Sequence, residues 1–189
     1  MANTLRIIGG EWRGRRIRFP PIEGIRPTPD RVRETLFNWL AGVVQGSRCL
    51  DLFAGSGALG LEALSRGAFA VTFVERHRVA AQSLRETAAK LAPARATVID
   101  ADAVAWLAGN AAPFDIVFLD PPFDAEVLPA TLSALETRGW LARESWIYIE
   151  MPAKHGKPPL PAGWIDHRSG RAGAVGYHLA RRGSGRGGD

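Results

Sequence analysis

The chain has 189 residues, of which 46% are hydrophobic and 23% are charged, and its net charge is +5. This length fits one globular domain, and no apolar run approaches the roughly 18 residues that indicate a membrane-spanning helix. Cys49 is the only cysteine, which excludes an intramolecular disulfide and a cysteine zinc site, and we expect no metal. The N-terminus lacks the pattern of a signal peptide, so we expect a cytoplasmic protein.

The charge is unevenly distributed along the chain. Residues 1–33 and 154–189 each carry a net charge of +5, whereas residues 34–153 carry −5. All but three of the 24 basic residues are arginine, whose guanidinium group binds phosphates and stacks on bases. A polyanionic partner is one interpretation, and an arginine excess that only reflects genomic base composition is the other.

The N-terminal segment is predicted to form a hairpin followed by a helix. Residues 5–8 (LRII) and 16–19 (RIRF) are short strand-like segments separated by glycines, which favours an antiparallel pair. Thr28-Pro29-Asp30 is typical of a helix start, with a Thr28 hydroxyl cap, a proline in the first turn and an early acid. The apolar face of this helix is predicted to consist of Val32, Leu36, Phe37 and Leu40.

Strands and helices are then predicted to alternate. Strands are expected at 48–53, 70–75, 96–100, 114–119 and 145–150, with helices at 57–66, 77–91, 102–108 and 126–138. This alternation indicates an α/β fold, with a parallel sheet covered by helices on both faces.

The C-terminal part changes character. Residues 151–163 are rich in proline and cannot form a long helix. The apolar stretches 164–168 and 174–180 fit a closing antiparallel hairpin, and residues 182–189 are expected to be a disordered tail. We therefore expect a single domain over 1–181, made of an N-terminal extension (1–45) and a catalytic core (46–181).

The first chemical signal is a glycine-rich turn after the strand that ends at Asp51. Residues 51–60 read DLFAGSGALG, which contains G-x-G-x-x-G between a predicted strand and a predicted helix. Gly55 and Gly57 would let the backbone approach a cofactor closely, and Glu75 at the end of the next strand would hold a ribose hydroxyl pair. Phe53 joins these residues as a candidate cofactor contact.

Two further acids refine the identity of the cofactor. A carboxylate at Asp51 would repel a pyrophosphate, whereas it would attract the ammonium and sulfonium of S-adenosylmethionine. Asp102 follows the next strand at the same edge of the sheet. It could accept a hydrogen bond from the adenine amino group, or it could simply cap the helix that follows.

The second signal is Asp120-Pro121-Pro122-Phe123, directly after the predicted strand 114–119. Neither proline has an N–H, so the loop offers acceptors for a substrate that donates, such as an exocyclic amine. Hydrogen bonds to both amine hydrogens would favour an attacking, pyramidal nitrogen, and Asp120 could take up charge or a proton as a methyl group arrives. Phe123 would provide a face on which the base stacks.

This combination resembles a known family. The Asp-Pro-Pro-aromatic motif is shared by amino-group methyltransferases that act on adenine N6 or guanine N2. Together with RIIGG at 6–10, Arg13-Gly14 and RPTPDRVRETLFN at 26–38, it is similar to the RsmD-type bacterial small-subunit rRNA guanine-N2 methyltransferases. The resemblance extends from about residue 6 to residue 151.

The resemblance implies a Rossmann-like class I methyltransferase with a seven-stranded, mostly parallel sheet and an added N-terminal hairpin and helix. It also implies S-adenosylmethionine as cofactor and guanine N2 of 16S rRNA in the small subunit as substrate, and we expect a monomer. The candidate RNA contacts are arginines of the basic N-terminal segment, namely Arg13, Arg15, Arg16, Arg26 and Arg31.

Three alternatives remain open from the sequence. An adenine-N6 methyltransferase acting on DNA or RNA could use the same loop, although DNA enzymes of that kind usually carry a separate target-recognition region. A dinucleotide-dependent oxidoreductase shares the fold, but the carboxylate of Asp51 disfavours it. A catalytically silent RNA-binding module would require the Asp-Pro-Pro-Phe loop to be accidental.

Overall fold

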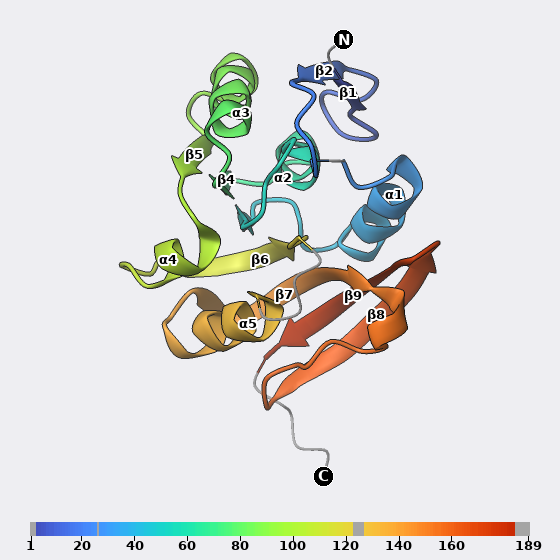
Figure 1. Ribbon diagram of the computed structural model, residues 1–189, viewed down its shortest axis with the longest axis vertical. Coiled ribbons are helices and arrows are strands. Elements are labelled where there is room, and N and C mark those ends of the chain that lie inside the picture. The colour runs from blue at the N-terminus through green and yellow to red at the C-terminus, as the bar shows by residue number, and fades with distance from the viewer. Residues whose placement is uncertain (1–2, 26, 123–126, 184–189) are drawn as a thin grey trace. The chain divides into compact units, whose positions relative to one another are not determined.

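The computed structural model describes residues 3–25, 27–122 and 127–183. The chain divides into two compact units, residues 1–103 and 104–189. Together they contain a seven-stranded, mostly parallel sheet and a separate two-stranded sheet, so the predicted α/β fold class is confirmed (Figure 1). Whether residues 1–181 behave as a single domain stays a prediction.

The first unit begins with a hairpin, as predicted, but its first strand lies two residues earlier than the expected 5–8. Strands β1 (Asn3–Arg6) and β2 (Arg16–Phe19) pair in antiparallel register, with Leu5 opposite Ile17. Helix α1 (Asp30–Trp39) follows, and its four predicted apolar positions are all buried. The predicted Thr28 cap is wrong, because the N-cap residue is Pro29 and no side chain caps the helix.

Three parallel strands form the sheet of the first unit, in the order β5-β4-β3. They are β3 (Arg48–Asp51), β4 (Ala70–Glu75) and β5 (Ala96–Asp100), joined by helices α2 (Ala58–Ser65) and α3 (Arg78–Leu91). Every residue of α2 is buried, whereas α3 has a two-sided pattern with one buried stripe. The register places Asp51 opposite Phe73 and Glu75 opposite Asp100, so the acids lie at the carboxyl ends of the strands.

The second unit contains strands in the order β6-β7-β9-β8. Strands β6 (Phe114–Leu119) and β7 (Leu141–Pro152) are parallel, and β8 (Trp164–Ala172) and β9 (Val175–Arg182) close the sheet in antiparallel register. Helix α4 (Ala103–Leu107), helix α5 (Val127–Thr137) and a short 3-10 helix, η1 (Ala153–His155), complete the elements. Four successive residues of β6, 116–119, are buried, as expected for a parallel strand covered on both faces.

Several boundaries in the second unit differ from the prediction: β7 and β9 are longer than expected, and β8 continues to Ala172 rather than 168. Strand β7 starts at Leu141 rather than 145, since Leu141 already pairs with Phe114 before an irregularity in the register. Strand β9 includes Arg182, which the sequence assigned to the tail. Arg182 stays in the sheet because its guanidinium binds the Glu136 carboxylate at 2.7 Å; residues 184–189 lie outside the described residues.

Among the described residues, no helix combines the length and the apolar character that crossing a membrane requires.

Candidate functional site

The glycine-rich turn of the first unit has the geometry that its sequence predicts. Gly55 and Gly57 have φ angles of +51° and +77°, a region that favours glycine, and Gly57 is the N-cap residue of α2. A Cβ on Gly57 would lie 2.5 Å from a methyl carbon of Leu84 on α3. At Gly60 a Cβ would lie 2.2 Å from the Phe73 ring, so this third glycine lets α2 pack closely on β4.

Asp51 ends β3 beneath this turn. Its side chain is almost wholly buried (3% of the residue exposed), and one carboxylate oxygen accepts a hydrogen bond of 2.9 Å from the amide of Gly60. Burial raises the pKa of Asp51 to about 7, and the nearby Glu75 carboxylate adds to the rise, while the Gly60 hydrogen bond opposes it. A cation near Asp51 would therefore be favoured, because it would offset the cost of this buried charge.

Glu75 ends β4 and is also buried, with 8% of the residue exposed. Its two oxygens accept hydrogen bonds from the amides of Gly55 (2.7 Å) and His77 (2.6 Å), so the carboxylate holds the glycine turn in place. Each carboxylate oxygen can accept more than one hydrogen bond, so these contacts are compatible with binding a ribose hydroxyl as well. Sequence reasoning missed the contact with Gly55, since it joins residues twenty positions apart.

The remaining candidate cofactor residues lie close by in the first unit. Phe53 is half-buried within the turn, and Asp102 is exposed two residues after Asp100, the partner of Glu75 in the β4–β5 register. Asp102 directly precedes α4, so its position fits both of the roles expected from the sequence. Their part in cofactor binding stays a prediction.

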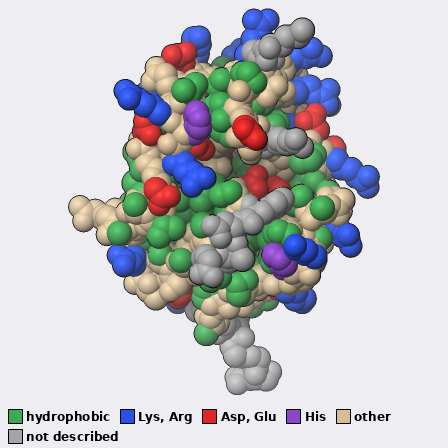
Figure 2. Space-filling view, in the orientation of Figure 1, with side chains coloured by type: hydrophobic (Ala, Val, Ile, Leu, Met, Phe, Trp, Pro, Cys, Tyr) green, Lys and Arg blue, Asp and Glu red, His purple; other side chains and the backbone are tan. Residues whose placement is uncertain are grey.

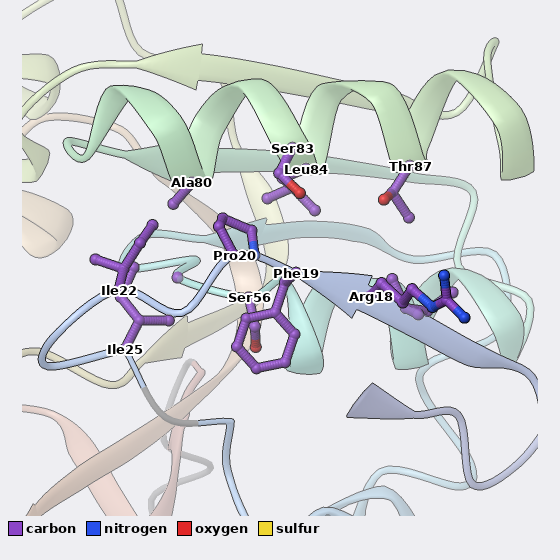
Figure 3. A pocket seen from close by; sticks show the side chains of 12 residues that line it. Arg18, Phe19, Pro20, Ile22, Ile25, Ser56, Ala80, Ser83, Leu84 and Thr87 are labelled. Atoms are coloured by element: carbon purple, nitrogen blue, oxygen red, sulfur yellow. The ribbon is translucent and has the colours of Figure 1, made fainter. Parts of the chain in front are cut away.

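A small pocket lies beside the glycine turn, and it was not predicted. One wall comes from the segment that follows β2, including Pro20, Ile22 and Ile25, and the other from α3 (Figure 3). Gly55 and Ser56 also line it. The N-terminal extension is therefore part of the surroundings of the glycine turn, rather than only an appendage of the domain.

The Asp120 loop belongs to the second unit. Asp120 is half-buried one residue beyond the end of β6, Pro121 is buried and Pro122 is exposed. Phe123, the fourth predicted residue of this motif, lies outside the described residues. The two prolines line a cavity of about 190 Å³ together with two residues of α5, the last three residues of β7 (150–152) and three residues that follow β7.

Tyr148, a buried residue of β7, lies close to the acidic side chains Glu150 and Asp120. The Tyr148 hydroxyl donates a hydrogen bond of 2.9 Å to Glu150, which also lines the cavity. Burial raises the pKa of Tyr148 well above its usual value, and the charges of Glu150 and Asp120 add to the rise. Tyr148 therefore stays protonated at neutral pH and acts as a hydrogen-bond donor.

Comparison with known proteins identifies the family. A family model described as conserved hypothetical protein 95 matches residues 5–181. Ribosomal RNA small subunit methyltransferase D of Escherichia coli K12 is 51% identical over 181 residues, which are 96% of this chain and 91% of that protein. The chain belongs to the ribosomal RNA small subunit methyltransferase D family. The resemblance seen in the sequence is thereby confirmed.

Solved structures of methyltransferases share the fold of this chain. The putative methyltransferase yhhF from E. coli aligns with a TM-score of 0.89 and 47% identity, covering 97% of this chain and 100% of that one. A T. thermophilus 16S rRNA N2 methyltransferase, solved with AdoMet and guanosine, aligns at a TM-score of 0.64 and 21% identity, over 97% of this chain and 50% of that one. The second match shows the fold alone.

A buried ionic network anchors the N-terminal extension of this family member, and it was not predicted. Arg33 of α1 and Glu62 of α2 are both fully buried, with a 3.2 Å contact between guanidinium and carboxylate. Glu62 also accepts hydrogen bonds from the amides of Ile8 and Gly9 and from Arg66. The carboxylate thus ties the loop after β1, helix α1 and the core helix α2 together.

The candidate RNA-binding arginines lie on the surface of the extension. Arg13, Arg15 and Arg16 are exposed on or beside the hairpin, where Figure 2 shows several basic side chains over β1 and β2. Arg31 is exposed on α1, whereas Arg26 lies outside the described residues. The anchoring by Glu62 gives the hairpin a fixed position, and RNA binding by these arginines stays a prediction.

Proposed function

We propose that this protein transfers a methyl group from S-adenosylmethionine to the exocyclic N2 amine of a guanine in 16S rRNA. The observation that carries the proposal is the Asp120-Pro121-Pro122 loop at the end of β6, in a chain that belongs to the ribosomal RNA small subunit methyltransferase D family. The loop presents acceptors and no backbone donor at either proline, which suits an amine that donates two hydrogen bonds.

The first unit fits S-adenosylmethionine. The left-handed backbone at Gly55 and Gly57 keeps the turn free of Cβ atoms, and the buried Asp51 carboxylate favours a cationic ligand. Glu75, held by hydrogen bonds from two backbone amides, is the residue we propose to accept hydrogen bonds from the ribose hydroxyls. These features favour a charged sulfonium cofactor over a dinucleotide, whose pyrophosphate the carboxylate of Asp51 would repel.

The cofactor supplies an electrophilic methyl group bound to a positively charged sulfur. Bound in this site, the cofactor would give its methyl group to guanine N2 and leave as S-adenosylhomocysteine, and Asp120 or water would take up the N2 proton. Asp120 and the neighbouring carbonyl oxygens hold the two amine hydrogens, so the nitrogen lone pair is drawn out of conjugation with the ring. Phe123 supplies the stacking face for the base.

The proposed partner is 16S rRNA, within the small ribosomal subunit or an intermediate of its assembly. The relative from E. coli is named for this subunit, and the exposed arginines of the hairpin offer contacts for its phosphates. With this substrate the protein acts in the cytoplasm, as a monomer and without a metal ion.

Incorporation of label from S-adenosylmethionine tests the proposal. The protein is incubated with labelled cofactor and, separately, small subunits, free 16S rRNA and duplex DNA. We expect label in small subunits or 16S rRNA, and micromolar or tighter cofactor binding without comparable binding of NADH. Label in DNA alone would support the adenine-N6 alternative, and tight NADH binding without any transfer would support an oxidoreductase.

A further inference from the structure

The cavity beside the Asp120 loop is large enough to receive a ring. Its volume is about 190 Å³, and its walls are Pro121 and Pro122 on one side and the end of β7 on the other. A cavity of roughly 150 Å³ holds benzene in a well-studied protein. Seven of the ten lining residues are apolar, and the polar ones are Glu150, His155 and Lys157. Lys157 is exposed and pairs with Asp166 at 3.1 Å, whereas Glu150 is buried, so the Glu150 carboxylate should have the stronger effect on which ligand the cavity accepts.

Glu150 is an acid of this lining. Only 4% of the residue is exposed, and it stands at the carboxyl end of β7. Leu119 of β6 is paired with Ile149 of β7 in parallel register. Asp120 and Glu150 are each the next residue along, so they follow a paired position of the two strands, and both carboxylates lie close enough to Tyr148 for their charges to raise the pKa of its hydroxyl.

Tyr148 holds the Glu150 side chain in place. Its hydroxyl donates to one carboxylate oxygen at 2.9 Å, and its raised pKa keeps it a donor. A carboxylate offers about four acceptor positions on its two oxygens, so it can hold the tyrosine and still accept hydrogen bonds from a ligand. The hydrogen bond from Tyr148 therefore orients the Glu150 carboxylate, which can accept a further hydrogen bond from a ligand in the cavity.

Guanine and adenine differ at the position next to their exocyclic amine. In guanine the ring nitrogen N1 carries a hydrogen beside the N2 amine, so this edge presents neighbouring donors. In adenine N1 has a lone pair instead, next to the N6 amine. Two neighbouring carboxylates match the first pattern, whereas the second would set a lone pair against a buried negative charge.

We propose that Glu150 accepts a hydrogen bond from N1–H of the target guanine and so makes the cavity specific for guanine over adenine. This inference rests on the proposed function and names the residue that selects its base. Asp120 then receives the N2 amine, and Glu150 the adjacent ring nitrogen. Glu150 contributes to recognition of the base through contact with it, and takes no part in the transfer of the methyl group.

The test compares nucleoside binding by the full chain and by E150Q in the presence of S-adenosylhomocysteine. The probes are guanosine, adenosine and 2-aminopurine riboside, which keeps the amine at C2 but has a lone pair at N1. The wild type should prefer guanosine to both other nucleosides. In E150Q the new amide can donate to N1, so the preference for guanosine over 2-aminopurine riboside should fall by about tenfold to a hundredfold.

Glu144→Gln is the matched control, because it makes the same change on the same strand at an exposed side chain that binds Arg181. It should keep the preference of the wild type. Tyr148→Phe removes the hydroxyl that orients Glu150 and keeps the carboxylate, so it should weaken guanosine binding without improving that of 2-aminopurine riboside. Melting curves verify that each variant is folded.

Several outcomes would overturn the inference. One is a wild type that binds guanosine no more tightly than adenosine; another is an E150Q preference equal to that of the wild type. An equal loss of all three nucleosides in a folded E150Q protein would assign Glu150 a structural role instead. The proposed function is judged separately by the nucleoside that the wild type methylates, so the two can fail independently.

Discussion

Asp51 should make stability and cofactor binding depend on pH in opposite directions. Its pKa is about 7 in the folded protein against an ordinary value of 3.8, because burial disfavours the carboxylate. The folded state thus binds the proton more tightly than the unfolded state. The stabilisation from this proton is complete below pH 3.8 and is lost as the pH rises through about 7.

The size of the effect follows from the two pKa values. A difference of roughly three pH units corresponds to about 4 kcal/mol over the full range, and most of it, about 2–3 kcal/mol, should be lost between pH 5 and pH 8. Asp51→Asn keeps an oxygen that can accept from Gly60 but does not titrate. The free energy of unfolding is measured in urea at several pH values for the wild type and for Asp51→Asn. The difference between the two proteins at each pH gives the contribution of Asp51 titration to stability.

Cofactor affinity should change in the other direction. The ionised carboxylate attracts the cationic cofactor, and the ionised fraction rises about tenfold between pH 6 and pH 8, so the affinity of the wild type should increase by about tenfold. Calorimetry should show no such rise for Asp51→Asn. The prediction is wrong if the free energy of unfolding and the cofactor affinity depend on pH in the same way in the wild type and in Asp51→Asn. Asp51 would then not titrate near pH 7.

Three further predictions concern the candidate site and the hairpin. Glu75→Ala should weaken S-adenosylmethionine binding by about 1.5–3 kcal/mol, the range for hydrogen bonds to a charged group; calorimetry that finds the affinity unchanged removes Glu75 from the cofactor site. Asp120→Ala should abolish transfer and leave cofactor affinity within about tenfold, because the lost interaction acts mainly in the transition state; a single-turnover rate near that of the wild type would refute the mechanism. Replacing Arg13, Arg15 and Arg16 by alanine should reduce the salt dependence of small-subunit binding by up to about two units of slope, with cofactor affinity constant. If the triple variant keeps both the salt dependence of small-subunit binding and the methylation activity of the wild type, the hairpin arginines are only solvated surface residues.

The sequence predicted the parts of the fold that periodicity controls. The strands 70–75, 96–100 and 114–119 are found at the predicted bounds, since each is an apolar run between turn residues. The glycine turn was also predictable from the spacing of its glycines. Gly55 and Gly57 have positive φ angles, which few residues other than glycine adopt.

What the sequence did not predict depends on contacts between distant residues. Arg33 and Glu62 look like ordinary surface charges on two helices, and only the fold buries both. Arg182 reads as part of a polar tail until Glu136, 46 positions earlier, pairs with it. The Thr28 error has a different origin, because a helix start pattern does not determine which residue ends up at the cap.

The selective role proposed for Glu150 also lies beyond the sequence. Glu150 follows an apolar run, as Glu75 does, although β7 continues for two more residues. The sequence pattern alone does not distinguish an acid that holds a loop from an acid that lines a cavity. The parallel register of β6 and β7 and the hydrogen bond from Tyr148 make that distinction.

The identity of the methylated nucleoside shows whether this protein transfers the methyl group to guanine N2. Small subunits lacking the modification are incubated with the wild-type protein and labelled S-adenosylmethionine, and the rRNA is then digested to nucleosides and separated by chromatography. We predict that the label elutes as N2-methylguanosine and is absent when Asp120→Ala replaces the wild type. Label in N6-methyladenosine, or N2-methylguanosine formed equally well by Asp120→Ala, would contradict the account.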